Sequence, residues 1–343
     1  MRFSRLAAAL GVALLSINIL GNTSPGTRLG LILANDPAVD RMRNVSVAEN
    51  TPVITNTVKP AVLPSPELSP TISALSVDEY FPPSTDSANI KETTIQGGMS
   101  IKNETDYEIN VTEFLSIGPQ ISLPADGPQI LIIHTHGSEA YTPAGLDRYE
   151  ESDNRRTEDK EYNVIRIGDE LTKLLESHGL NVLHDREIHD YPSYTGSYTR
   201  SGQAVENYLK ENPNIAVVID LHRDALDSNG IIYKTMAEES GVCASQVMLL
   251  TGSNASGLQH DNWQKNLGLA LYLQQAVNNV HPTLMRPVSL VKERYNMHLT
   301  NGSLILEVGS SGNTLQEALA AIRLFADAAG PALCKLIEPA ESE

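Results

Sequence analysis

The sequence predicts an α/β protein in which a mostly parallel sheet carries helices on both faces, preceded by a membrane segment and an extended stalk. Two observations predict the sheet. Apolar runs rich in β-branched residues end abruptly in polar residues near positions 134, 220 and 307, as buried strands do. Stretches of helical periodicity separate these runs, and strands that alternate with long helices form parallel sheets covered by helices.

Residues 1–21 are predicted to be a signal peptide or a short membrane anchor. Arg2 and Arg5 precede an apolar run over residues 6–20, which is shorter than the roughly 20 apolar residues of a comfortable membrane span. Positive charges before such a segment stay in the cytoplasm, so both interpretations place the rest of the chain outside it. We therefore expect a single-pass protein of the cell membrane with an extracytoplasmic catalytic domain, or an exported protein if the segment is cleaved. A soluble N-terminal helix is the alternative.

Residues 22–118 are predicted to be a stalk. They are rich in Pro, Thr, Ser and Asn, and they show no sustained helical or strand periodicity. Dense proline disfavours helices and central strands and favours extended linkers. The alternative is that short apolar pieces, such as Ile101 and residues 111–115, form small strands at the edge of the catalytic domain, which we expect over residues 119–343.

Local patterns predict the elements of that domain. Helical periodicity begins at Val164, and Gly179 follows as a C-terminal cap. Thr314 and Glu317 form a capping box, T-x-x-E, at the start of the last helix. The other predicted elements are a short strand at 181–183, helices at about 201–211 and 262–280, and strands at 244–251 and 303–308.

Charge and cysteine content exclude some classes of function. The formal net charge of −17 argues against a general nucleic-acid-binding protein, which needs a basic surface. Cys243 and Cys334 either pair or remain buried thiols. Neither belongs to a C-x-x-C motif, which excludes a zinc site made of thiolates.

Four residues at the ends of the predicted strands form a candidate zinc site. His136 and Glu139 give the spacing H-x-x-E after the first apolar run, and His222 follows the second. Ligands gather at the carboxyl ends of strands in α/β sheets, and hydrolytic zinc takes three protein ligands and one water, whose pKa falls toward ~7. Glu307 ends the third run and is predicted to be the general base. Asp159, before the first helix, is a rival third ligand.

Residues near these ligands are predicted to assist them. His134, Asp220 or Asp224 could orient a ligating imidazole through its second nitrogen. Arg223 is predicted to be catalytic, because a bidentate donor can hold a carboxylate or a developing oxyanion. A structural role is the alternative for each.

Substrate contacts are predicted in three loops or helix starts. The loop over residues 189–200 has three tyrosines, a composition suited to a groove for sugar or peptide. Surface aromatics without a ligand, or purely structural residues, are the alternative. The predicted substrate-binding residues are Tyr194, Tyr198, His260, Trp263, Asn266, Arg294 and His298.

Seven motifs in order resemble the stage II sporulation protein P family, over about residues 120–335. They are HTHGSEAY (134–141), the helix entry at 159–163, HDYPSYTGSYTRS (189–201), DLHRDA (220–225), HDNWQKN (260–266), RYNMH (294–298) and ILEVGSSGNTLQEA (305–318). The family consists of membrane-anchored peptidoglycan hydrolases of endospore formers, related to the zinc N-acetylmuramoyl-L-alanine amidases.

The resemblance implies a zinc cofactor and cleavage of the amide between N-acetylmuramic acid and L-alanine, with a second activity on the peptide cross-link. It also implies a role in engulfment beside the sporulation protein D lytic transglycosylase and the membrane protein M. By the same resemblance, His136 and His222 match zinc ligands and Glu307 matches the catalytic glutamate. The related amidases place their glutamate ligand near the first helix, where this chain has Asp159, so Glu139 and Asp159 both remain open and spacing favours Glu139.

Two other functions are compatible with the same residues. H-x-x-E with a distant histidine and glutamate also serves carboxypeptidase-like zinc peptidases, which would act on wall peptides. A non-catalytic module that binds the cell wall is the second, and it predicts that a ligand or the base is missing. All four residues are present.

Overall fold

The computed structural model describes residues 90–95, 98–145, 147, 149–239 and 241–339. The predicted membrane segment at 1–21 and the stalk up to residue 89 lie outside this part of the chain. Within it, no helix combines the length and the apolar character that a membrane crossing needs.

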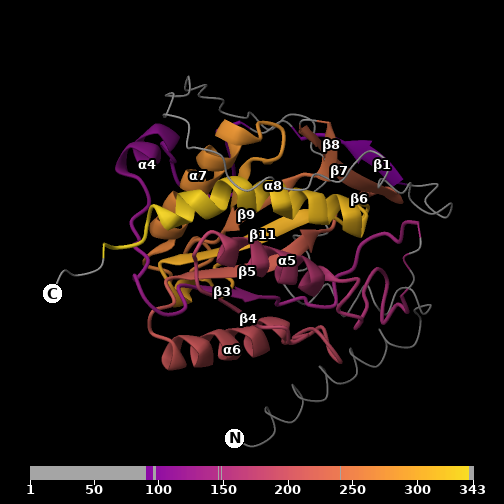
Figure 1. The fold of residues 1–343 in the computed structure, drawn as a ribbon, viewed down its shortest axis with the longest axis horizontal. Coiled ribbons are helices and arrows are strands. Elements are labelled where there is room, and N and C mark those ends of the chain that lie inside the picture. Colours follow the sequence, from indigo (N-terminus) through magenta and orange to yellow (C-terminus); the bar gives the residue numbers. More distant parts are fainter. Residues whose placement is uncertain (1–89, 96–97, 146, 148, 240, 340–343) are drawn as a thin grey trace, which may run out of the picture. The chain divides into compact units, whose positions relative to one another are not determined.

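A seven-stranded sheet forms the centre of the domain (Figure 1). Its order is β2-β10-β9-β11-β5-β3-β4, and every neighbouring pair is parallel except β9 and β11. The prediction of a mostly parallel sheet is therefore confirmed, but the sheet consists of two parallel blocks that run in opposite directions. The strands are β2 (Ile101–Asn103), β3 (Ile130–Ile133), β4 (Val182–His184), β5 (Val217–Asp224), β9 (Val247–Thr251), β10 (Val288–Leu290) and β11 (Gly302–Ser310).

Helices cover both faces of this sheet, as predicted. Figure 1 shows α7 (Trp263–Val280) and α8 (Leu315–Cys334) on one side of the strands and α6 (Ser197–Glu211) on the other. Side chains alternate along a strand, so Ile130 and Ile132 of β3 join the core under α5 (Val164–Ser177), α7 and α8, whereas Leu131 and Ile133 join a smaller core with α6.

Capping residues set the helix ends close to their predicted positions. Thr314 and Glu317 form the predicted capping box at the start of α8. The Asn163 side chain accepts a hydrogen bond from the Ile165 amide at the start of α5, and Gly179 follows the end of that helix with φ of 90°.

The folded part begins earlier than residue 119, where we expected the catalytic domain to start. β2 pairs with β10, Ile101 lying opposite Val288, and Phe114 of α4 (Val111–Ile117) lies against Gly268 of α7. These elements are so short that their periodicity does not stand out from the proline-rich sequence before them. The expected boundary is therefore too late.

A second, four-stranded sheet lies beside the first and was not predicted as such. It contains β1 (Ile90–Thr93), β6 (Asp227–Ser228), β7 (Ile231–Glu239) and β8 (Val242–Ser245). The single strand predicted at 244–251 is therefore two strands, β8 and β9, that belong to different sheets. Cys243 and Cys334 are both free thiols, so the predicted alternative of a disulfide does not apply.

Candidate metal centre

Three parallel strands bring the predicted site residues to one edge of the sheet. β3, β5 and β11 run in the same direction, and His136 follows the end of β3 by three residues. Glu307 of β11 lies directly opposite His222 of β5 in the register. Side chains at paired positions of parallel strands project from the same face, here the face that α6 covers. The convergence expected from the sequence therefore occurs.

His136, His222 and Glu139 form the inner part of this cluster. The two imidazole rings lie with centroids 5.4 Å apart, and Glu139 Oε2 is 3.4 Å from His222 Nδ1. Both histidines have an exposed fraction of 0%, and that of Glu139 is 2%. Asp159, the rival ligand, is exposed, and its Oδ1 accepts a hydrogen bond from the Glu161 amide. The geometry therefore favours Glu139 as the third ligand.

Orphaned buried atoms in the cluster fit a bound cation. His136 Nδ1, both ring nitrogens of His222 and Glu307 Oε2 are buried without a hydrogen-bond partner. Burial of such groups costs free energy unless another interaction compensates, and imidazole nitrogen with carboxylate oxygen is the donor set that zinc takes in hydrolases. The residues present therefore fit a zinc ion.

A different trio has the most closely spaced ligand atoms in the described part of the chain. One atom from each of Asp185, Glu187 and His189 lies within 4.8 Å of the others. There, however, His189 Nε2 is 2.9 Å from Asp185 Oδ2, and the two groups satisfy each other. The cluster of His136, Glu139 and His222 is wider, but it leaves Nδ1 of both histidines without a hydrogen-bond partner.

Aromatic side chains from the loop before α6 and from the first turn of that helix cover His136. The Tyr194 hydroxyl forms a hydrogen bond with His136 Nε2 at 3.0 Å, and its ring stacks on the imidazole with centroids 4.5 Å apart. The Tyr198 ring meets the same imidazole edge-on at 5.4 Å. Both predicted substrate-binding tyrosines therefore lie on the metal cluster.

Arg156 and Asp190 support this arrangement from the side. The Arg156 guanidinium lies 5.0 Å above the Tyr194 ring, contacts the Asp190 carboxylate, and donates to Glu139 Oε1 at 3.4 Å. Asp190 in turn accepts hydrogen bonds from the Ser138 amide and hydroxyl, at 3.0 and 2.6 Å. The polar contacts of Arg156 hold Oε1 of Glu139, while Oε2 of the same carboxylate faces His222.

The environment raises the pKa values of Glu307 and His222 and lowers that of His136. Burial, reinforced by the negative charge of Asp224, raises the pKa of Glu307 to about 8. Burial lowers the pKa of His136 to about 4. Burial also opposes the charge on His222, but Asp220 and Glu139 outweigh it and raise the pKa of that imidazole well above its usual value. Carboxyl and imidazole groups of such divergent acidity are typical of active sites.

The neighbours predicted to orient the imidazoles have different partners. Asp220 Oδ1 lies 2.9 Å from His222 Nε2, which is the expected orienting contact. Asp224 instead binds Arg286 at 2.7 Å. His134 donates from Nδ1 to the Leu221 carbonyl at 2.9 Å and meets His184 through Nε2.

The Arg223 guanidinium is buried and bonded to backbone carbonyls. Its Nε donates to the Ala140 carbonyl and its Nη2 to the Arg155 carbonyl, both at 2.9 Å. The backbone amide of Arg223 donates to Glu139 Oε2 at 3.1 Å. The predicted catalytic role is thus replaced by a positioning one, because the guanidinium is taken up by the backbone around Glu139.

Among the other five predicted substrate-binding residues, Asn266 lies at the amino end of β11. Asn266 accepts a hydrogen bond from the Ser303 amide at 3.2 Å and donates to His260 at 3.2 Å. Ser303 precedes Glu307 by four residues, or roughly 13 Å of strand. The other members of this group are Trp263, stacked on Tyr107, Arg294, bonded to the Gln259 carbonyl, and His298.

The direction of β9 explains this separation. β9 and β10 run antiparallel to β11, so their carboxyl ends lie at the amino end of β11. We had treated residues after any strand as candidates for the same groove. The structure keeps Asn266 and His260 at that end. Tyr295, next to Arg294, instead packs its ring on Tyr198 with centroids 5.2 Å apart, beside the metal cluster.

The region that carries the cluster also matches a known family. A family model described as stage II sporulation protein P covers residues 69–330. The chain belongs to this family. The stage II sporulation protein P of Bacillus subtilis strain 168 is 27% identical over 220 residues, which make up 61% of this chain and 52% of that protein. The chain thus spans about half the length of this curated relative.

Solved structures of N-acetylmuramoyl-L-alanine amidases show a remote likeness to this member of the stage II sporulation protein P family. The amidase of Nostoc punctiforme is 13% identical, with a TM-score of 0.36, and the match covers 62% of this chain and 98% of the amidase. The amidase of Clostridium difficile 630 is 14% identical, with a TM-score of 0.37, and the match covers 62% and 97%. The assignment of the cluster rests on this chain's own residues.

Arg156 and Asp190 are the site residues that sequence reasoning missed. Both lie inside the range that matches the stage II sporulation protein P family. Arg156 stands beside Arg155 in a loop dense in charges, and nothing local distinguishes the two. Asp190 belongs to the motif HDYPSYTGSYTRS, in which we selected the tyrosines. The sequence offered two local signals for Asp190: it follows a histidine, and it precedes the tyrosines of this motif.

Proposed function

We propose that this chain is a zinc-dependent peptidoglycan hydrolase that cleaves the amide bond between N-acetylmuramic acid and L-alanine during engulfment in sporulation. The observation that carries the proposal is the buried cluster of His136, Glu139, His222 and Glu307, with its unpartnered donor atoms. Membership of the stage II sporulation protein P family supports the sporulation role and the wall substrate. The resemblance of the motifs to the zinc amidases supports the choice of bond.

His136, Glu139 and His222 would hold the zinc ion, which supplies Lewis-acid activation of water and of the scissile carbonyl. Glu307 then moves the protons. Its buried carboxylate would take a proton at Oε2 from the attacking water and return it to the leaving nitrogen, and the positive charge of a bound zinc ion would favour the ionised form that accepts this proton. The water oxygen bonds to the carbonyl carbon, the C–N bond breaks, and the nitrogen leaves as an amine.

Access to the cluster depends on the tyrosine loop. His136 and His222 have no exposed surface, and the Tyr194 ring lies directly on His136. A substrate amide reaches these atoms only after Tyr194 moves away. We propose that Tyr194 and Tyr198 then line the groove for the glycan or the stem peptide, because aromatic faces pack well on sugars and peptide planes.

Product analysis on purified peptidoglycan tests the proposal. The full chain with zinc should release stem peptides that begin with a free L-alanine amino group and leave glycan strands without peptides. A chelator should abolish the release, and added zinc should restore it. A second product, from cleavage of the peptide cross-link, is compatible with the family resemblance.

Other product patterns would support the alternatives. Release of terminal amino acids alone would assign a carboxypeptidase-like zinc peptidase. Retention on peptidoglycan without any product, in protein shown to be zinc-loaded, would assign a non-catalytic module that binds the wall.

Location and partners remain proposals from the sequence. Residues 1–21 would attach the chain to the cell membrane, with the catalytic domain outside the cytoplasm, or direct its export. The expected partners are the sporulation protein D lytic transglycosylase and the membrane protein M. Fractionation of sporulating cells and co-purification with the tagged full chain would test both expectations.

A further inference from the structure

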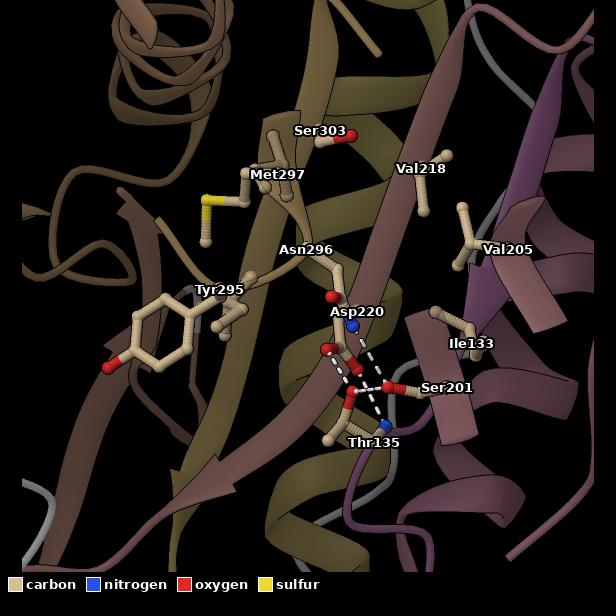
Figure 2. A pocket seen from close by; sticks show the side chains of 12 residues that line it. Ile133, Thr135, Ser201, Val205, Val218, Asp220, Tyr295, Asn296, Met297 and Ser303 are labelled. Atoms are coloured by element: carbon tan, nitrogen blue, oxygen red, sulfur yellow. Dashed lines mark hydrogen bonds between the residues drawn. The ribbon is translucent and has the colours of Figure 1, made fainter. Parts of the chain in front are cut away.

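A small pocket lies beside the metal cluster, on the face of the sheet that α6 covers. Figure 2 shows apolar side chains of the strands along most of its wall and a group of polar side chains at one end. The polar group consists of Thr135, Ser201, Asp220 and Asn296, which hydrogen bonds join into one network. Asp220 is the member that touches the metal cluster, through His222.

The Asn296 side chain fixes one end of this network. Its Nδ2 donates to the Tyr198 carbonyl oxygen at 2.9 Å and to Ser201 Oγ at 3.1 Å. A carbonyl oxygen only accepts, so the nitrogen of the amide must face α6, and both of its N–H groups are engaged. Ser201 Oγ is therefore an acceptor toward Asn296.

The Asp220 carboxylate fixes the other end, because it only accepts. Its Oδ1 accepts from the Thr135 amide at 2.8 Å, and its Oδ2 accepts from the Thr135 hydroxyl at 2.6 Å. Having given its proton to Asp220, Thr135 Oγ1 must accept from Ser201 Oγ at 2.7 Å. Ser201 also lies 3.4 Å from the Tyr198 carbonyl, but the shorter contact is the stronger one. Donation therefore runs in one direction, from Asn296 to Asp220.

The backbone around Asn296 is built to hold this position. Tyr295 has φ of 48°, in the left-handed region that side chains other than glycine rarely adopt. Gly202 of α6 leaves room for the amide, because a Cβ atom there would lie 2.8 Å from Asn296 Oδ1. A strained backbone conformation such as that of Tyr295 is kept only where surrounding contacts hold it. Here the two hydrogen bonds from Asn296 to α6 provide such contacts.

The network also decides which nitrogen of His222 is free. Asp220 Oδ1 lies 2.9 Å from Nε2 as an ion-pair contact, and an atom that only accepts favours a proton on the nitrogen that it faces. Nδ1 is the nitrogen on the side of Glu139 Oε2, at 3.4 Å. Nδ1 thus faces the remaining ligands of the cluster.

We propose that Asn296, Ser201 and Thr135 are positioning residues that hold the Asp220 carboxylate on Nε2 of His222, so that His222 offers Nδ1 to the zinc ion. The inference rests on the proposed zinc site and adds to it the ligating atom and the residues that select it. Outer hydrogen-bond partners of a ligating histidine typically change metal affinity by about 10–100-fold.

Zinc titration of the full chain and two Thr135 variants tests this chain of contacts. Thr135→Val keeps the volume but removes the hydroxyl, and it should weaken zinc binding by about tenfold or more. Thr135→Ser restores the hydroxyl and should bind as the wild type does. Ser303→Ala is the matched control, since Ser303 lines the same pocket but bonds to Thr300. Equal zinc affinity in Thr135→Val and the wild type would overturn the proposal.

Nuclear magnetic resonance of the zinc-loaded full chain, with labelled histidine, gives an independent readout. The imidazole ¹³C and ¹⁵N shifts should show His222 bound through Nδ1 with a slowly exchanging proton on Nε2. Asn296→Asp keeps the shape but removes both donors, so it should speed that exchange even if Thr135→Val fails to fold. Coordination through Nε2 would refute the inference and leave the zinc site standing, whereas a wild-type chain that binds no zinc would refute both.

Discussion

Two ends of the central sheet carry polar side chains, and they differ in what those side chains bind. At the carboxyl ends of β3, β5 and β11, His136, His222 and Glu307 are buried with unpartnered atoms. At the amino end of β11, Asn266 makes bonds with His260, the Met297 carbonyl and the Ser303 amide. The clustered atoms without partners at the first end retain binding capacity. At the second end the Asn266 side chain joins loops, although His260 Nδ1 and His298 Nδ1 have no hydrogen-bond partner there.

The difference shows that position after a strand is not enough to predict a site. Both groups follow strands in the sequence, but only strands of one direction deliver their ends to one edge. The predictions below test this difference between the two ends. Mutations at the first end should reduce ligand binding, and mutations at the second end should reduce stability.

The largest effect is expected at His222. His222→Ala removes a ligand from the cluster, so zinc binding and hydrolysis should both fall below detection. The fold should survive because His222 belongs to neither of the two hydrophobic cores on the faces of the sheet, but stability should fall because Asp220 and Glu139 lose their buried partner. Calorimetric zinc titration and circular dichroism check the two halves of this expectation. Activity close to that of the wild type would remove the basis for the metal centre.

Glu307→Gln should separate binding from turnover. The amide keeps the size of the side chain but cannot take up a proton, so kcat should fall by about 10²–10⁴-fold while zinc affinity is retained. Rates of peptide release, measured beside zinc titrations of the same preparations, check this. A parallel loss of zinc binding would reassign Glu307 from base to ligand.

The same substitution should change how stability depends on pH in the metal-free protein. The pKa of Glu307 is about 8 in the folded chain against 4.5 for the free group, so the folded chain holds a proton that the unfolded chain has released. This carboxyl group therefore lowers the free energy of unfolding progressively as pH rises from 4.5 to about 8.

Glu307→Gln removes that loss, and the variant should be more stable than the wild type at pH 8 by on the order of a few kcal/mol. Near pH 4.5 the two proteins should unfold at similar denaturant concentrations. Urea unfolding at several pH values measures the difference, and a difference that does not change with pH would contradict the raised pKa.

The smallest effect on the metal site is expected at the other end of the sheet. Asn266→Ala leaves the Ser303 amide, the Met297 carbonyl and the His260 ring without their partner, so the free energy of unfolding should fall by about 2 kcal/mol. Zinc affinity should not change. Denaturation and zinc titration of the same variant check both, and a loss of zinc affinity without a loss of stability would reverse the comparison.

The elements, the family and the identities of the four central residues could be predicted from the sequence. Periodicity and caps are local, so α5, α7 and α8 lie close to their expected positions. His136, His222 and Glu307 each lie at the end of a long apolar run. The carboxyl ends of parallel strands lie at the same edge of a sheet, so these residues are expected to lie close together. Periodicity, helix caps and apolar runs are properties of the local sequence and do not depend on which distant segments pack against them.

Only the tertiary structure decided how those residues are surrounded. Strand direction across a sheet depends on connections far apart in the chain, so β9 carried His260 and its neighbours to the other edge. The short elements of residues 90–118 become ordered through pairing with β7 and β10, which their own sequence does not encode. The partners of Arg156, Arg223 and Asp220 likewise come from distant segments, because hydrogen bonds of buried polar groups are settled by packing rather than by local sequence.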